Sequence, residues 1–279
     1  MEREAREGKE KVKLWVLGSG SRGNAVVVES GACRLLIDVG FGPRILKKRM
    51  QAVGIAPESI EACIITHEHS DHSGGAARAQ KRWNWPMFAT LGTVTNTRLA
   101  KLPVTTFRAG ATLSFSELDV ATFATPHDAA EPVGVAVTAR TTGERVAVCT
   151  DIGFASDAVR DVVRDADIMV IESNHDEQML RDGPYPAWLQ ARIASNSGHL
   201  SNRACADLVR EAVTPRLRQI VLAHLSEENN TPRVAFESMR AAVRGTAFRG
   251  MLVPAAQDTV IGPFSPTGYR EERQLSLEL

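Results

Sequence analysis

The amino-acid sequence predicts an α/β fold, a four-layered αββα sandwich in which two β-sheets pack face to face between outer helices. The first observation is an order of strand-rich and helical stretches that occurs twice along the chain. The second is size, because 279 residues, 43% of them apolar, can bury a large core. We therefore expect a single domain over residues 1–279, with frayed ends at residues 1–11 and about 268–279.

The first part of the chain is rich in short apolar runs typical of strands. These runs predict strands at residues 12–17, 25–29, 33–37, 62–65 and 86–89. Helices are predicted at residues 43–53, 76–83 and 93–99, the first of them beginning at Pro43 and carrying a basic face. Strands and helices in this order predict one sheet with helices on its outer side.

The loop at residues 18–24 reads Gly-Ser-Gly-Ser-Arg-Gly-Asn. A β-branched stretch follows it in place of a helix, which argues against a dinucleotide site. One interpretation is a tight hairpin. The other is that small side chains and backbone N–H groups let an anionic substrate approach closely, with Ser19, Ser21 and Asn24 as substrate-binding candidates.

The second part of the chain repeats the alternation. A hairpin is predicted from residues 112–115 and 118–124, followed by strands at 133–139, 144–149, 168–171 and 219–222. Helices are predicted at 155–164, at 178–194 with an interruption at 183–186, at 202–213 and at about 232–244. Ser201 is the predicted N-cap of the helix over 202–213. A Pro/Gly-rich segment closes the chain.

A dense run of candidate metal ligands follows the predicted strand at 62–65. His67, His69, Asp71 and His72 lie within six consecutive residues. His67 and His69 point to the same side of an extended segment, whereas Asp71 and His72 are offset beyond the turn. This one stretch can therefore supply ligands to two metal ions.

Further candidate ligands stand at or just beyond the ends of other predicted strands. His127 could complete the first site, His224 the second, and Asp151 could bridge them. Two divalent ions about 3.5–4 Å apart can share and deprotonate a water. Asp38 follows the strand at 33–37; a lone aspartate there would cap a turn, but its nearness to the histidines favours a role in supporting them. The alternative interpretation is a set of polar turn residues with ordinary hydrogen bonds.

Residues 67–72, His-Glu-His-Ser-Asp-His, resemble the signature of the metallo-β-lactamase superfamily. Asp38, His127, Asp151 and His224 follow that family's order. The resemblance implies the metallo-β-lactamase fold and two divalent metal ions. It assigns His67, His69 and His127 to the first metal, Asp71, His72 and His224 to the second, and Asp151 to both. It also gives catalytic roles to Asp71 and, in support, to Asp38.

Two further segments resemble transfer-RNA 3′-processing ribonucleases of this superfamily, where a histidine like His199, oriented by a glutamate like Glu172, lies by the scissile phosphate. His199 would then contact the phosphate or act as general acid. Residues 18–24, 172–176, 198–202 and 224–230 are similar as a set to the bacterial WalJ/YycJ group. That resemblance implies a 5′-to-3′ exonuclease acting on DNA.

Composition limits the partners. The formal net charge is zero, so a nucleic acid would have to be held by the metals and a local basic surface. Four cysteines without a CxxC pair indicate buried free thiols, and no apolar run is long enough to span a membrane. We expect a cytoplasmic protein, and the sequence does not indicate an oligomeric state. Candidates for the basic surface are Arg22, Arg44, Lys47, Lys48, Arg78, Lys81, Arg82 and Arg203.

The sequence thus predicts a dinuclear metal-dependent phosphodiesterase that acts on DNA, with RNA or a small phosphodiester as other substrates to consider. Histidine and carboxylate ligands suit Zn²⁺ or Mn²⁺, and Fe²⁺ is a further candidate. The main alternative is a small-molecule hydrolase of a cyclic phosphodiester, lactone or thioester. A metal-binding regulator without hydrolytic activity is a third hypothesis.

Overall fold

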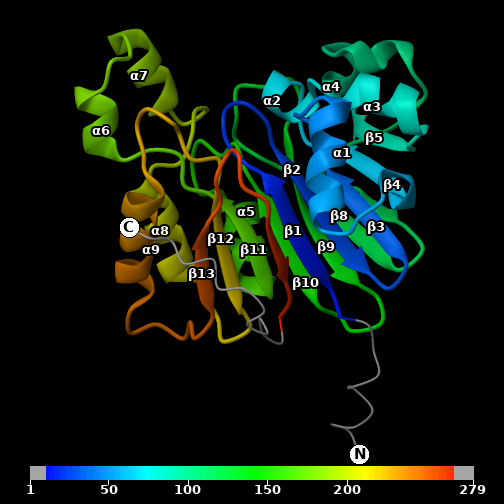
Figure 1. The fold of residues 1–279 in the computed structure, drawn as a ribbon. Helices are drawn as coiled ribbons and strands as arrows, with labels where there is room; N and C mark the ends of the chain where they lie inside the picture. Colours follow the sequence, from blue (N-terminus) through cyan, green and yellow to red (C-terminus); the bar gives the residue numbers. More distant parts are fainter. Residues whose placement is uncertain (1–10, 267–279) are drawn as a thin grey trace, which may run out of the picture.

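The structure, a computed structural model that describes residues 11–266, contains two seven-stranded sheets packed face to face (Figure 1). The first sheet has the order β14-β1-β2-β3-β4-β5-β6 and the second the order β13-β12-β11-β10-β9-β8-β7. In each sheet one half is antiparallel and the other half parallel. The predicted αββα sandwich is confirmed.

The first sheet is formed by the N-terminal strands and closed by the last strand of the described chain. Strands β3 to β6 run parallel, so their carboxyl ends meet at one edge. Its strands are β1 (Lys13–Gly18), β2 (Ala25–Ser30), β3 (Cys33–Ile37), β4 (Ala62–Ile65), β5 (Met87–Thr90), β6 (Val104–Phe107) and β14 (Ile261–Phe264). Its helices are α1 (Pro43–Ala52), α2 (Ser70–Ser73), α3 (Ala76–Trp83) and α4 (Leu91–Thr95), with 3₁₀ turns at Pro57–Ser59 and Arg98–Lys101.

The second sheet repeats this arrangement. Strands β10 to β13 run parallel, and their carboxyl ends lie next to those of the first sheet. Its strands are β7 (Thr112–Ser114), β8 (Leu118–Ala124), β9 (Val133–Ala139), β10 (Arg145–Cys149), β11 (Ile168–Glu172), β12 (Gln219–Ala223) and β13 (Met251–Pro254). Its helices are α5 (Asp157–Asp165), α6 (Glu177–Asp182), α7 (Ala187–Ile193), α8 (Asn202–Ala212) and α9 (Pro232–Val243).

Three apolar clusters hold the layers together. The central cluster lies between the sheets and is built from the inward-facing residues of both, such as Val28 and Val135. A second cluster packs α5, α8 and α9 onto the second sheet, and a third packs α1 and α3 onto the first. Because all the strands that carry candidate ligands belong to these clusters, the edge where they end has a fixed geometry.

Three strand ends at this edge carry a residue in the left-handed backbone region. They are Asp38 after β3 (φ 63°), Asp151 after β10 (φ 58°) and His224 after β12 (φ 54°). This conformation is uncommon for residues other than glycine. Among the described residues the one other such case is Asn84, which ends α3. The backbone therefore turns sharply at the ends of three strands. Two of these turns carry candidate ligands, Asp151 and His224, and the third carries Asp38, the candidate supporting residue.

The loop after β3 packs tightly against α2. A Cβ atom at Gly40 would lie 1.9 Å from the carbonyl oxygen of Asp71, so only glycine fits there. The N–H of Val39 donates to the carbonyl oxygen of His72 (2.7 Å), and the N–H of Asn24 donates to that of Asp71 (2.7 Å). The backbone itself thus fixes α2 over the ends of the first sheet.

Three strands were not predicted, and one predicted helix is wrong. β6, β13 and β14 escape the sequence patterns, because β6 has two exposed threonines and the other two contain proline, which is unfavourable in strands. The helix predicted at 93–99 is divided, since Thr97 is extended and caps the 3₁₀ turn that follows. The interrupted helix at 178–194 is confirmed as α6 and α7. Residues 1–10 and 268–279, expected to fray, lie outside the described residues.

One composition-based prediction is confirmed. All four cysteines are buried free thiols. Between residues 11 and 266, none of the helices has the length and apolar character required to cross a bilayer.

Candidate metal centre

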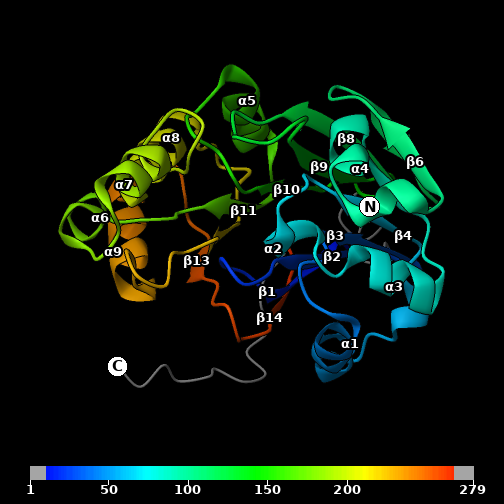
Figure 2. The ribbon, with the colours of Figure 1, turned by 90° about the horizontal axis from the view of Figure 1, so that it is seen from above.

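The candidate ligands converge where the parallel strands of both sheets end. Figure 2, which looks onto that edge, shows α2 lying near the junction of the two sheets. β4 leads to His67 and His69, whereas β10, β11 and β12 lead to Asp151, Glu172 and His224. Ends of parallel strands are the usual place for a site in α/β folds.

One group of candidate ligands consists of His67, His69 and His127, whose ligand atoms all lie within 4.8 Å of one another. Nδ1 of His127 donates to the carbonyl oxygen of Gly198 (3.0 Å), which leaves its Nε2 facing His69 Nδ1 at 3.2 Å. Nε2 of His67 is buried and has no hydrogen-bond partner. Burial lowers the pKa of His67 and of His127, and this favours the neutral imidazole that binds metals.

The second group consists of Asp71, His72 and His224. Oδ2 of Asp71 lies 3.0 Å from Nε2 of His224 and 3.3 Å from Nε2 of His72. Nδ1 of His72 donates to Oδ2 of Asp38 (2.7 Å), and Oδ1 of Asp38 accepts the N–H of Thr66 (2.8 Å). Asp38 therefore fixes the ring of His72 with Nε2 toward the centre, as carboxylates do behind metal-binding histidines.

Asp151 lies between the two groups and is 2% exposed. Its Oδ2 is 2.9 Å from Nε2 of His72, and its Oδ1 is 3.5 Å from Nε2 of His127 and 3.6 Å from Nδ1 of His224. Burial alone would raise the pKa of this carboxyl, but the imidazoles of His224 and His72 lower it well below its usual range. Asp151 is therefore an ionised carboxylate within reach of both groups.

Glu172, the last residue of β11, is fully buried and holds two histidines. Its Oε1 accepts from Nδ1 of His199 (2.8 Å) and of His224 (2.9 Å), and its Oε2 accepts the N–H groups of Ile152 (2.8 Å) and Leu200 (3.1 Å). Burial opposes ionisation, but the charge of His199 and the hydrogen bonds from His199 and His224 lower the pKa of Glu172 to about 2. In return, Glu172 outweighs the effect of burial and raises the pKa of His199.

This arrangement fits divalent cations on three grounds. The donors are imidazole nitrogens and carboxylate oxygens, a set that suits Zn²⁺, Mn²⁺ or Fe²⁺. A buried imidazole nitrogen, Nε2 of His67, has no partner, which a metal ion would supply. Ionised Asp71 and Asp151 both approach Nε2 of His72 (3.3 and 2.9 Å), and a cation would neutralise their charge.

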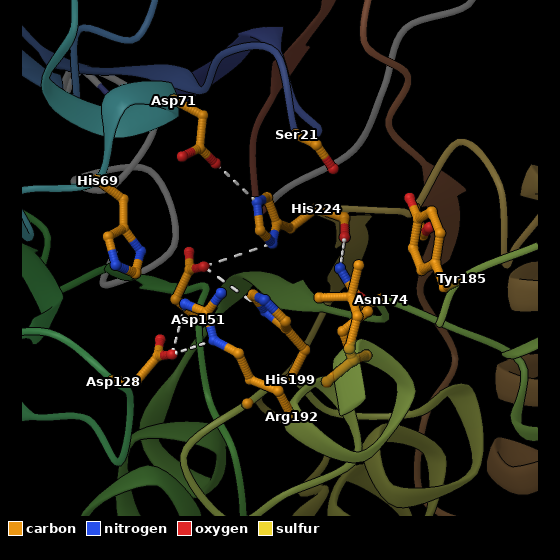
Figure 3. A pocket seen from close by; sticks show the side chains of 14 residues that line it. Ser21, His69, Asp71, Asp128, Asp151, Asn174, Tyr185, Arg192, His199 and His224 are labelled. Carbon is orange, nitrogen blue, oxygen red and sulfur yellow. Dashed lines mark hydrogen bonds and ion pairs between the residues drawn. The ribbon is translucent and has the colours of Figure 1, made fainter. Parts of the chain in front are cut away.

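A pocket of about 240 Å³ opens onto the centre (Figure 3). His69, Asp71, Asp151, His199 and His224 form its inner wall. Residues of α7 and the segment before it, Tyr185, Leu189, Arg192 and Ile193, form the opposite wall. Arg192 pairs with Asp128 through its Nη2 (2.6 Å) and Nε (2.7 Å). One wall of the pocket is therefore formed by α7 and the segment before it, which the sequence did not indicate as part of the site.

The three candidates in the Gly/Ser loop have different positions. The hydroxyl of Ser19 accepts the N–H of His224 (2.8 Å) and donates to Oδ1 of Asn24 (2.8 Å). Asn24 is buried as well, with Nδ2 3.3 Å from Oδ2 of Asp71. The contacts of Ser19 and Asn24 are thus to residues of the centre itself, and Ser21 alone of the three lines the pocket. The loop is also the tight hairpin between β1 and β2.

Six of the eight basic candidates belong to α1 and α3, and the other two lie elsewhere. Those of α1 and α3 lie over the first sheet, whereas Arg203 belongs to α8 on the second. Arg22 pairs with Glu227 (2.7 Å) and Asp258 (2.8 Å). Sequence reasoning missed Asp128, Tyr185 and Arg192. The short helix that begins after Pro186 carries no pattern of ligands that would have indicated its place beside the site.

Residues 33–224 match the family described as the beta-lactamase superfamily domain. The chain belongs to this superfamily. It is 32% identical over 238 residues to the exodeoxyribonuclease YycJ of Bacillus anthracis, a match that covers 84% of this chain and 89% of the relative. It is 33% identical over 234 residues to the exodeoxyribonuclease WalJ of Streptococcus pneumoniae, covering 81% and 86%.

Among solved structures, the metallo-β-lactamase fold protein YhfI of Bacillus subtilis has a TM-score of 0.65 and 18% identity, covering 91% of this chain and 99% of that one. This likeness shows the fold. The predicted resemblance to the superfamily and to its WalJ/YycJ group is confirmed. The chain is accordingly a metal-dependent hydrolase of this superfamily.

Proposed function

We propose that this hydrolase cleaves phosphodiester bonds of DNA and removes nucleotides from the 5′ end. The observation that carries the proposal is the joining of two three-ligand groups by Asp151, with His199 beside them on the pocket wall. Relatives with exodeoxyribonuclease names, similar over most of both chains, support DNA as the substrate.

His67, His69 and His127 would hold one metal ion, Asp71, His72 and His224 the other, and Asp151 both. When bound, two such ions supply an acidified water and positive charge for a displacement at phosphorus. Asp38 and Glu172 would not bind the ions. Their carboxylates accept hydrogen bonds from Nδ1 of His72 and His224, so that Nε2 of each ring faces the ions.

His199 would donate a proton to the leaving oxygen. Its Nδ1 is held by Glu172 (2.8 Å), so Nε2 is the nitrogen free to meet the substrate, and its side chain is 22% exposed. The raised pKa of His199, which results from the charge of Glu172 and its hydrogen bond, favours the protonated ring required of a general acid.

The test is a digestion time course on linear duplex DNA with a 5′-phosphate and an end label, using purified protein with Mn²⁺ or Zn²⁺. Stepwise loss of nucleotides from the 5′ end is the expected result. Asp71→Ala is the matched inactive variant, because it removes one ligand of the second group. Intact DNA after incubation with a protein that holds two metal ions per chain, measured by elemental analysis, would contradict the proposal.

A second candidate function is hydrolysis of a small ester or cyclic phosphodiester. The size of the pocket, about 240 Å³, and the zero net charge favour it, since neither feature provides a long basic track for DNA. High turnover of a small soluble phosphodiester, together with no binding of DNA at low salt, would support this function over the first.

A further inference from the structure

Helix α7 separates two cavities and buries none of its side chains. Leu189 and Ile193 line the metal-centre pocket, whereas Ala187, Gln190 and Ala191 line a cavity on the other side. Figure 1 shows α6 and α7 standing apart from the outer layer formed by α8 and α9. A short helix is stabilised mainly by packing. Since α7 has no side chain in the core, we expect it to pack against a ligand in one of the cavities that it lines.

The cavity on the far side of α7, here named the second pocket, has a volume of about 550 Å³. That volume lies in the range of sites for small organic ligands. Ala187, Gln190, Ala191 and Ala194 face it at helical spacing, and Leu180 and Leu200 add apolar surface. His199 lines both pockets, so the two cavities adjoin at this residue.

One polar side chain of the second pocket has no partner. His175 is 2% exposed, and its Nδ1 is buried without a hydrogen bond. Its backbone is fixed, because its carbonyl oxygen accepts the N–H of Asn202 (2.8 Å) and it forms a β-bridge with Ser201. His175 also lines the second pocket, so this imidazole is a candidate contact for a polar group of a ligand there.

The lining selects the chemistry of that ligand. The wall of alanine and leucine suits a flat apolar face, and the ring of His175 belongs to the same lining. Two charged groups, Glu177 and Arg181, also line the pocket. Their opposite charges leave it near neutrality, and the carboxylate of Glu177 opposes a phosphate. A neutral heteroaromatic ring fits these properties best.

We propose that the second pocket binds the base of the nucleotide whose phosphate lies at the metal centre. This inference rests on the proposed function and names a subsite for it. A base held between apolar side chains and hydrogen-bonded at its edge is a general way of recognising a single unstacked nucleotide. His199, shared by both pockets, would then lie where phosphate and base are joined.

The first test measures binding and does not depend on hydrolysis. Zinc-loaded protein is titrated calorimetrically with deoxyadenosine 5′-monophosphate and with deoxyribose 5-phosphate, which lacks the base. We expect the nucleotide to bind about tenfold tighter or more. In Ala191→Trp, which fills the second pocket from the exposed side of α7, this ratio of dissociation constants should fall to about one.

Ala241→Trp is the matched control, because Ala241 is an exposed alanine on α9 outside both pockets. It should keep the wild-type ratio. His175→Phe keeps a ring in place but removes both nitrogens, and it should lower the ratio about two- to tenfold. A ratio near one in the wild type, or an unchanged ratio in Ala191→Trp, would overturn the inference.

These outcomes are separate from those of the digestion assay. Binding that depends on the base, in a protein that digests no DNA, would remove the exonuclease function and leave the nucleotide pocket. If the protein digests DNA but binds the nucleotide and deoxyribose 5-phosphate with equal dissociation constants, the exonuclease function stands and the proposed base-binding pocket is wrong. If the melting temperature of His175→Phe is well below that of the wild type, the result for Ala191→Trp alone decides whether the inference holds, since Ala191 lies outside the core.

Discussion

The two halves of the candidate metal centre are built in different ways. The first sheet supplies His67, His69, Asp71 and His72 from six consecutive residues around α2. The second supplies its residues from separate strand ends between His127 and His224. The first half is therefore a local structure, held by one turn, whereas the second exists only when several parallel strands are in register.

The difference extends to the supporting carboxylates. Asp38 holds one histidine, His72, whereas Glu172 holds both His199 and His224 and also accepts two backbone N–H groups. A change in the second half should thus disturb more of the centre than a comparable change in the first. Four experiments test this comparison, from the largest expected effect to the smallest.

Asp151→Ala should have the largest effect, because this carboxylate lies within reach of both groups. We expect hydrolysis to fall by about three orders of magnitude or more and bound metal to fall below two ions per chain. Elemental analysis and an end-labelled DNA assay measure the two quantities. Wild-type activity with full metal content would show that the halves work without this link.

His199→Ala tests a residue of the second half that has no counterpart in the first. We expect both metal ions to remain and hydrolysis to fall about 100-fold or more, because a general acid is lost and no metal ligand is. Metal content and single-turnover rates separate these effects. Loss of a metal ion in this variant would make His199 a ligand instead.

Glu172→Gln and Asp38→Asn form a matched pair, since each replaces a supporting carboxylate by its amide. Loss of such support costs about 10- to 100-fold in metal affinity. Glu172→Gln should lie at the upper end and Asp38→Asn at the lower, because Glu172 orients two histidines and Asp38 one. Competition with a chromogenic chelator measures the affinities. Equal losses would remove the proposed asymmetry.

Arg192→Ala should have the smallest effect. The pair with Asp128 is largely open to solvent, with Arg192 56% and Asp128 29% exposed, and such pairs contribute about 1 kcal/mol or less. We expect kcat/KM to fall less than about fivefold and the difference to vanish at high salt. A loss of 100-fold that persists at high salt would mean that Arg192 itself contacts the substrate.

The sequence predicted the two sheets and the convergence of ligands at one edge, because buried strands and strand-end polar residues leave strong local patterns. It did not predict β6, β13 or β14, whose residues are partly exposed or include proline and depend on pairing with a neighbour. The pocket wall formed by α7 and the segment before it was missed for a similar reason. Nothing local to Tyr185 or Arg192 indicates that α7 faces residues such as Asp128, far away along the chain.

The left-handed residues at three strand ends have a consequence for the evolution of heat resistance. Asp38, Asp151 and His224 each occupy a backbone conformation that costs on the order of 1 kcal/mol and that glycine would adopt freely. The backbone conformation taken by itself would therefore favour glycine at these positions, whereas the contacts of the side chains retain aspartate and histidine. A thermophilic version of this protein must gain its stability elsewhere, in the sheets and their outer helices.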